Sequence, residues 1–293
     1  MNTSLASRIG TVKQRAAKLA AVRAFFSERT VLEADTNMLS HAAPVDAHID
    51  VMQVDMGNSK TGYLHTSPEY GLKKLLAAGS GDIYQLGHVF RAEEESPLHS
   101  PEFTMLEWYR VGMPYQTFIK ETLELFRLFL GPLLAETLTY KQAFSLHAGI
   151  DIHEDLAPHT LPFSEKAPTW DRDTQLNLLF SHLIEPKLGQ NKLTAITDWP
   201  SSQAALAKTN TVNGETVAKR FEIYFKGIEL ANGFDELTDP LEQRTRLENE
   251  NQKRLALGKN TLPIDEEFLK ALETLPECCG VAVGFDRLML LSL

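Results

Sequence analysis

Acidic and phenolic side chains lie beside apolar ones in a predicted strand near the middle of the chain. In the strand at 103–110, FTMLEWYR, alternate side chains share a face, so Phe103, Glu107 and Tyr109 lie together. The opposite face is apolar and suits a core. An acid and a phenol are unusual groups to bury for packing alone, so the polar face is a candidate binding surface.

A second predicted strand, at 83–93, precedes this one and carries Arg91 and Glu93 on one face. The loop between the two strands is too long for a tight hairpin, and it contains His99. A ligand site and an ordinary cross-strand salt bridge beside a solvated loop both fit this pattern. The residues alone leave the two interpretations open.

A predicted hairpin, RFEIYFKGIELANGF, brings two carboxylates together. With Lys226-Gly227 as a two-residue turn, Tyr224 lies opposite Glu229 and Glu222 opposite Ala231. Glu222 and Glu229 then become diagonal neighbours on one face. Such a pair can hold a hard cation such as Mg²⁺ together with phosphate oxygens, although two exposed acids at a sheet edge fit the pattern too.

The segment GVAVGFDR near the end of the chain combines a bare strand face with a helix start. Gly280, Ala282 and Gly284 share one face, which leaves room for a flat ligand against the backbone. Asp286 is expected to cap the following helix, with Arg287 in its first turn. A helix N-terminus beside an arginine suits a phosphate group, and close helix–strand packing through the glycines is the alternative.

The elements that would position these residues alternate irregularly between helix and strand. At 66–77 a capped helix is expected, with Ser67 as the N-cap and Pro68 in its first turn. Helices are also predicted at 11–29, 173–184, 240–257 and 266–275, and 115–148 is expected to be mainly helical. Strands are predicted at 31–33, around 49–54 and at 193–198, and the hairpin spans 220–234. This order lacks a regular βαβ rhythm and predicts an α+β fold with an antiparallel sheet flanked by helices.

Composition narrows the class of protein. The chain has 293 residues, 29 basic and 39 acidic side chains and a net charge of −10, which argues against a polyanion as main partner. No apolar run is long enough to span a membrane, and the first residues do not resemble a signal peptide. The cysteines, Cys278 and Cys279, are neighbours and fit neither a disulfide scaffold nor a zinc site. A cytoplasmic globular protein is expected.

Five segments, in this order, resemble the class II aminoacyl-tRNA synthetases. FRAEEESPLHSPEFTMLEWYR (90–110) resembles motif 2, and GVAVGFDR (280–287) resembles motif 3. ELANGFDEL (229–237) is similar to the metal- and amino-acid-binding strand of the lysyl branch, and TSPEY (66–70) and ITDWPSSQAALAK (196–208) fit as well. The resemblance implies the catalytic core of this class, an antiparallel sheet flanked by helices.

The same resemblance carries expectations about domains and assembly. The helix at 11–29 and the strand after it take the place of motif 1, the usual dimer interface, so a homodimer is expected. The resemblance implies one catalytic domain over 1–293, without the anticodon-binding domain that precedes motif 1 in lysyl-tRNA synthetases.

The resemblance also implies roles for individual residues. Arg91 would hold the α-phosphate and carboxylate oxygens and, with Arg287, carry catalysis; Glu93 would read the adenine amino group and Phe103 stack on the ring. His99 and Arg287 would steady the outer phosphates. The implied ATP contacts are Arg91, Glu93, His99, Ser100, Phe103, Glu229, Leu230, Gly284 and Arg287. The implied amino-acid contacts are Ser67, Glu69, Glu107, Tyr109, Asn232, Glu236 and Ala282, and the implied Mg²⁺ ligands are Glu222 and Glu229.

Within the class, the chain most resembles stand-alone lysyl-tRNA synthetase paralogues. These use ATP to activate lysine or β-lysine as an adenylate and attach it to a lysine side chain of elongation factor P. Ala282, where lysyl-tRNA synthetases have glycine, favours this branch. Action on tRNA is not expected, because no basic stripe is present. A small tRNA-acting synthetase, an enzyme that makes a free amide, and a silent amino-acid-binding module are the alternatives. The silent module requires the loss of Arg91, Glu229 or Arg287, and all three are present.

Overall fold

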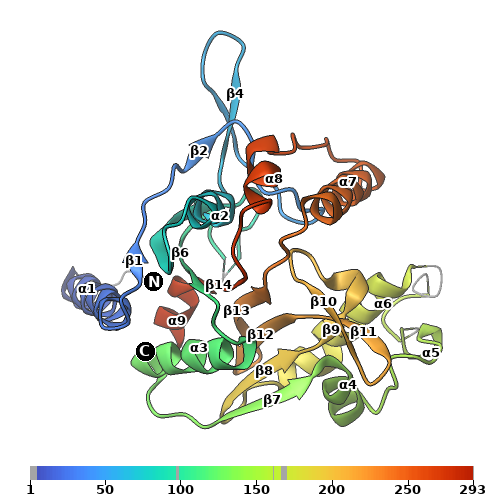
Figure 1. Ribbon diagram of the computed structural model, residues 1–293. Helices are drawn as coiled ribbons and strands as arrows, with labels where there is room; N and C mark the ends of the chain where they lie inside the picture. The colour runs from blue at the N-terminus through green and yellow to red at the C-terminus, as the bar shows by residue number, and fades with distance from the viewer. Residues whose placement is uncertain (1–4, 97–98, 161, 166–169, 293) are drawn as a thin grey trace. The chain divides into compact units, whose positions relative to one another are not determined.

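The computed structural model describes residues 5–96, 99–160, 162–165 and 170–292 (Figure 1). Its internal contacts divide the chain into two compact units. Unit 1 comprises residues 1–131 and 238–293, and unit 2 comprises residues 132–237. Each is described by itself, and the expectation of a single catalytic domain stays a prediction.

Unit 1 is built on four strands in the order β1-β5-β6-β14. These are β1 (Leu32–Glu33), β5 (Ile83–Phe90), β6 (Glu102–Val111) and β14 (Cys278–Gly284). The pairs of β6 with β5 and β14 are antiparallel, as predicted, whereas β1 runs parallel to β5. The alternation expected along β6 is confirmed by the partners of neighbouring residues: Trp108 contacts the rings of Phe26 and Phe118, whereas the Tyr109 hydroxyl donates to Glu107.

One face of these strands packs against long helices. Trp108 of β6 contacts Phe26 of α1 (Leu5–Ser27) and Phe118 of α3 (Tyr115–Leu130). The short C-terminal helix α9 (Phe285–Leu291) joins them through Phe285, whose ring lies 5.4 Å from that of Phe129. This is the apolar face predicted from the sequence of β6.

The opposite face is associated with α2 (Glu69–Ala77), which packs against α8 (Glu266–Leu272). The rings of Tyr70 and Phe268 stack with centroids 3.9 Å apart. Helix α7 (Pro240–Ala256) completes this side, and its buried Arg254 donates hydrogen bonds to the carbonyls of Asp46 and Ile49. A small projecting sheet comprises β2 (Leu39–Ser40), β3 (Gln53–Asp55) and β4 (Thr61–Leu64).

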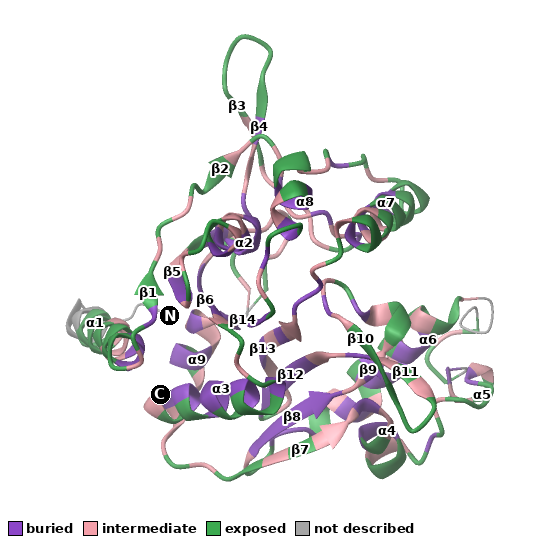
Figure 2. Ribbon diagram, viewed as in Figure 1, coloured by how far each residue is buried: buried purple, intermediate pink, exposed green. Residues whose placement is uncertain are grey.

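Unit 2 also contains four consecutive strands, in the order β13-β12-β8-β7. These are β7 (Ala135–Thr139), β8 (Leu193–Thr197), β12 (Arg220–Phe225) and β13 (Ile228–Asp235), with β7 parallel to β8. A second sheet comprises β9 (Trp199–Pro200), β10 (Thr209–Val212) and β11 (Glu215–Ala218). Figure 2 shows β8 and β12 as buried and β10 as exposed.

The helices of unit 2 surround an aromatic core. They are α4 (Tyr140–Ala148), α5 (Ala157–Thr160) and α6 (Arg172–Leu179), which continues as a π-helical turn at Phe180–Ile184, with 3₁₀ turns at Glu185–Lys187 and Ser201–Gln203. The ring of Tyr140 lies 4.7 Å from that of Trp199 and 5.2 Å from that of Phe180. The α+β class predicted from the sequence is confirmed.

The stretch 115–148 is mainly helical, as predicted, because α3 and α4 cover most of it, with β7 between them. One local prediction in this part of the fold was wrong. Ser67 does not cap α2, which begins after Pro68, because the Ser67 hydroxyl instead donates to Glu107 and accepts from the Glu69 amide. None of the described helices is long and apolar enough to cross a membrane.

Gly189 provides a test of the packing in unit 2. It has a φ of +66°, and a Cβ there would lie 2.5 Å from Phe225 Cα. We expect Gly189→Ala to lower the free energy of unfolding by about 1–2 kcal/mol through backbone strain and by about 1–3 kcal/mol more through the clash. Gly214→Ala is the matched control, because Gly214 has a φ of +84° and open space around it. Urea unfolding that shows equal losses for both variants would contradict the clash.

Candidate active site

Glu107 lies at the centre of a buried polar cluster in unit 1. Its side chain points to the same face of β6 as Tyr109, whose hydroxyl donates to Glu107 Oε1 at 2.7 Å. The Ser67 hydroxyl donates to the other carboxylate oxygen, also at 2.7 Å. Glu107 is only 2% exposed. The structure therefore brings together three of the residues predicted to contact the amino acid.

The neighbouring strands present small or neutral residues to Glu107. Ala282 of β14 lies directly opposite it on one side, flanked on the same face by Gly280 and Gly284. On the other side lies Gln85 of β5, whose side-chain oxygen accepts hydrogen bonds from the backbone and hydroxyl of Thr36. The bare strand face predicted at 280–284 thus borders the acidic residue.

Glu69 adds a second carboxylate to this cluster. Its backbone amide donates to Ser67 Oγ at 3.0 Å, so one hydroxyl connects the start of α2 with Glu107. The Glu69 carboxylate is paired with Lys73 Nζ at 2.6 Å. Burial, and then the nearby charge of Glu69, raises the pKa of Glu107 to about 7, against hydrogen bonds from Ser67 and Tyr109 and the charge of Lys73 that lower it.

Arg91 and Phe103 lie together on the loop side of these strands. The Arg91 guanidinium carbon is 5.2 Å from the Phe103 ring centroid, and Arg91 Nη1 lies 3.7 Å from Glu94 Oε1. Arg91 Nε is buried without a hydrogen-bond partner among the described residues, as expected for a donor that awaits a ligand. The prediction that β5 extends to Glu93 was wrong, because β5 ends at Phe90 and Glu93 is exposed with a φ of +62°.

His99 and Arg287 form a second basic contact. Arg287 Nη2 donates to His99 Nε2 at 2.5 Å, while Ser96 Oγ contacts the other ring nitrogen at 2.8 Å. Burial and the positive charge of Arg287 lower the pKa of His99, so its ring is neutral at physiological pH. Ser100 is exposed beside it, and residues 97–98 of this loop lie outside the described residues.

Asp286 does not cap α9, contrary to the prediction. The cap position is Gly284, and the Asp286 carboxylate instead accepts hydrogen bonds from the Thr104 backbone amide, at 2.7 Å, and from the Arg15 guanidinium. The competing donors from β6 and α1 outweigh the local capping geometry. Arg287 follows in the first turn of α9, as predicted.

The hairpin predicted in unit 2 is confirmed, with one change of register. Its turn is Lys226-Gly227, both with positive φ, and Tyr224 pairs with Glu229. Glu222 pairs with Asn232, however, because the register between the strands shifts by one residue at a bulge. Glu222 and Glu229 still share a face, since each shares the face of Tyr224.

Glu222 is the most constrained acid of this face. It is 4% exposed and accepts hydrogen bonds from the Tyr224 hydroxyl and the Arg220 guanidinium. Arg220 also donates to Asn232 Oδ1 at 3.2 Å, and its guanidinium carbon lies 4.4 Å from the Trp199 ring centroid. Sequence reasoning missed Arg220, although its position two residues before Glu222 on one strand was a usable signal.

The other predicted residues of unit 2 lie along β13 and just beyond it. Leu230 is buried at the bulge, and Glu236 is buried next to the end of the strand, where it bridges to Ala207. Among the described residues, no group of three or more histidine, cysteine, aspartate and glutamate side chains could hold a metal ion. The carboxylates of Glu222 and Glu229, on one face of the hairpin, can nevertheless supply oxygen ligands to a hard cation such as Mg²⁺ whose other ligands are phosphate oxygens.

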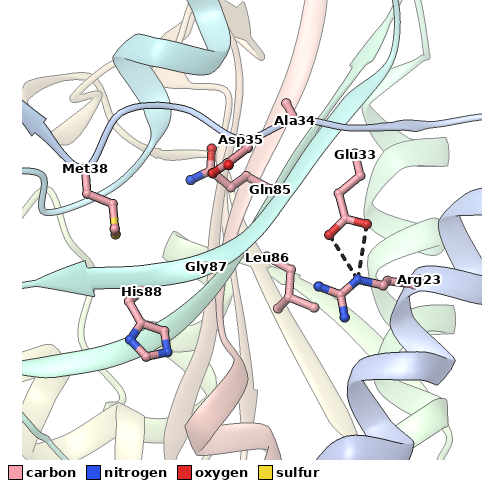
Figure 3. Close-up of a pocket in the computed structure, with 9 residues that line it drawn as sticks. All are labelled: Arg23, Glu33, Ala34, Asp35, Met38, Gln85, Leu86, Gly87 and His88. Carbon is pink, nitrogen blue, oxygen red and sulfur yellow. Dashed lines mark hydrogen bonds and ion pairs between the residues drawn. The ribbon is translucent and has the colours of Figure 1, made fainter.

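A separate pocket of about 340 Å³ lies beside β1 and β5 in unit 1 (Figure 3). Arg23 and Glu33 form an ion pair at its wall, with Met38 and His88 on the opposite side. None of the predicted site residues lines it.

The chain belongs to the class II tRNA synthetases (D, K and N), whose family pattern it matches over residues 6–293. Within that class it is similar to proteins named elongation factor P–(R)-β-lysine ligase. The one from Vibrio cholerae serotype O1 is 49% identical, over 97% of this chain and 92% of its own length. Those from Vibrio vulnificus and Sodalis glossinidius are 48% and 45% identical, each over 97% of this chain and 92% and 91% of their own lengths.

The burial of Glu107 predicts a pH-dependent cost to stability. The pKa of Glu107 is about 7 in the folded protein and 4.5 in the unfolded chain. The free energy of unfolding therefore falls as the pH rises toward and through 7, because the folded protein holds the proton more tightly than the unfolded chain does. Glu107→Gln removes the titration. We expect the difference in unfolding free energy between Glu107→Gln and wild type to change by roughly 2 kcal/mol, in favour of the variant, when the pH is raised from 5.5 to 8. Urea unfolding at both pH values measures this, and a difference that does not change with pH would contradict the buried, raised carboxyl.

Proposed function

We propose that this protein is an ATP-dependent ligase that activates (R)-β-lysine or lysine as an aminoacyl adenylate and transfers it to a lysine side chain of elongation factor P. The proposal is supported by membership of the class II synthetases and by relatives that carry the name of this ligase over nearly their whole length. A translation factor as acceptor places the reaction in the cytoplasm.

The buried pair of carboxylates, Glu69 and Glu107, carries the proposal. Both are at most 9% exposed, and the Ser67 hydroxyl, which donates to the Glu107 carboxylate, accepts from the Glu69 backbone amide. A substrate with two ammonium groups can offset the desolvation of two such acids, whereas a neutral amino acid has one ammonium group to offer. We assign the amino-acid contacts to Ser67, Glu69, Glu107, Tyr109, Asn232, Glu236 and Ala282.

In the first step the substrate carboxylate attacks the α-phosphorus of ATP, and pyrophosphate leaves. Arg91 has a buried donor available for the α-phosphate and the attacking carboxylate. Arg287, held by neutral His99, offers positive charge to the outer phosphates. Phe103 would stack on adenine, and exposed Glu93 would accept from its amino group. Positioning and electrostatic stabilisation then supply the catalysis, with no covalent enzyme intermediate.

Glu222 and Glu229 fit a hard cation by the chemistry of their oxygen donors, and in this proposal they hold Mg²⁺. The ion supplies charge neutralisation to the triphosphate when bound. Tyr224 and Arg220 keep Glu222 fixed by hydrogen bonds. We assign Leu230 and Gly284, with their backbone groups, to the nucleotide contacts, together with Ser100.

In the second step the neutral amine of the acceptor lysine attacks the adenylate carbonyl. The new amide bond forms as the bond to AMP breaks, and the acceptor ammonium must first lose a proton because only the free amine is a nucleophile.

Amino-acid-dependent exchange of pyrophosphate into ATP tests the proposal. We expect exchange with (R)-β-lysine or lysine in the presence of Mg²⁺, and a loss of roughly 10²–10³-fold in Arg91→Ala and Arg287→Ala. Arg244→Ala is the control, because Arg244 lies on α7 and pairs with exposed Glu266. Transfer to purified elongation factor P and to tRNA is measured in parallel. Wild-type protein without exchange for either lysine isomer would refute the activity, and transfer to tRNA alone would refute the acceptor.

A homodimer is part of the same proposal. Apolar side chains follow β1 and β2 at the surface, with Leu32 59%, Met38 48% and Leu39 37% exposed. The pocket of Figure 3 adjoins them through Met38 and Glu33. Exposed apolar residues gathered on one segment support a protein contact, and we propose a second copy of the chain as the partner.

Leu32→Arg is expected to convert the dimer to a monomer in sedimentation velocity experiments at micromolar concentration, because a buried unpaired charge opposes association. Leu134→Arg, at a position 79% exposed in unit 2, is the control and should remain dimeric. A wild-type protein that sediments as a monomer, or a Leu32→Arg variant that stays dimeric, would contradict the proposed interface.

A further inference from the structure

Lys73 is a buried cation to which the proposed reaction assigns no role. Its side chain is 0% exposed, although lysine is seldom buried completely unless it is paired. It lies one turn after Glu69 in α2, and its ammonium contacts the Glu69 carboxylate at 2.6 Å. Exposed helix pairs of this spacing contribute little, but burial makes this pair costly to break.

Apolar contacts fix the Lys73 side chain from the other side. Its Nζ lies 5.9 Å from the ring centroid of Phe268 on α8, and that ring stacks on Tyr70. Lys74, the next residue, shows the contrast. It is 31% exposed and pairs with Asp265 and Glu267 at the surface.

The charges around Glu107 explain why a cation is needed here. Glu69 and Glu107 are both buried, and the Ser67 hydroxyl connects the Glu107 carboxylate to the Glu69 backbone amide. The charge of Glu69 opposes the ionisation of Glu107, because like charges repel. Lys73 lowers the pKa of Glu107, while Glu69 raises it. The described groups that face Glu107 come from four elements: Ser67, Glu69 and Lys73 from the α2 segment, Tyr109 from β6, Gln85 from β5 and Ala282 from β14. From the side of α8, the charge of Asp265, the N-cap of that helix, raises the pKa of Tyr70.

We infer that Lys73 is a positioning and specificity residue of the amino-acid site: its ammonium fixes the Glu69 carboxylate and lets two acids stand together, ready for an ammonium-bearing substrate. This inference rests on the proposed function. Without Lys73, Glu107 would retain its proton to a higher pH, and the site would bind a cationic amino acid poorly.

Two substitutions with opposite expected effects test the inference. At low pH, KM for the amino acid should rise as Glu107 gains a proton. Lys73→Met removes the cation, so this rise should begin at a pH about one unit higher than in wild type. KM at pH 7 should then be roughly five- to tenfold higher, with kcat little changed. Glu69→Gln leaves Lys73 near Glu107 and removes the like charge, so the rise in KM at low pH (the acid limb of the profile) should move to lower pH. Lys73→Arg keeps the charge and should restore the wild-type limb. Lys74→Met is the matched control.

A merely structural role for Lys73 would lower the stability of Lys73→Met without moving the pH dependence of its KM, and that result would overturn the inference. The measurement uses pyrophosphate exchange, so a wild-type protein without exchange would refute the proposed function instead. In that case urea unfolding at pH 5.5 and pH 8 still decides about Lys73. Lys73→Met should lose more stability at pH 8 than at pH 5.5, and an equal loss at both values would overturn the inference.

Discussion

A carboxylate can be buried only where hydrogen-bond donors and a compensating charge come with it, and Glu107 imposes this condition on unit 1. Ser67 and Tyr109 fill its two oxygens, so the segment before α2 must approach β6 closely. The start of α2 then brings Glu69 to the same place. The position of this helix follows from an acid that the packing of the strands alone does not require.

The other face of β6 is formed by the alternate residues of the strand, and it packs against the helices α1 and α3. Trp108 is fully buried against α1 and α3, and its ring nitrogen donates to Glu121 at 3.2 Å. Arg110 Nη2 pairs with Glu121 in turn, at 3.4 Å, so Glu121 joins the two polar side-chain groups on this side. One strand therefore supplies both a hydrophobic anchor and a polar site. A shift of its register by one residue would exchange the two faces and destroy both.

The sequence was sufficient for features that depend on local chemistry. The hairpin turn at Lys226-Gly227 and the alternation along β6 are set by neighbouring residues, and the structure has both. The bulge beside Leu230 was not predictable, because neither strand carries a local signal that fixes the register beyond the turn. Lys73 was missed for a related reason. A glutamate and a lysine four residues apart usually mark an exposed helix face, and only the packing of α8 against α2 buries this pair.

Asp286 shows how a residue with a strong local preference can serve distant elements instead. Its carboxylate accepts from the backbone of Thr104 on β6 and from Arg15 on α1, and Arg15 also donates to the Thr104 hydroxyl at 2.5 Å. The side chains of Arg15 and Asp286 are 34% and 41% exposed, so the ion pair by itself contributes little stability. Its importance is geometric. Three elements meet at one carboxylate directly before Arg287, so the orientation of that arginine depends on where α1 lies. Helix α1 belongs to the segment that we expect, from the family resemblance, to form a dimer contact.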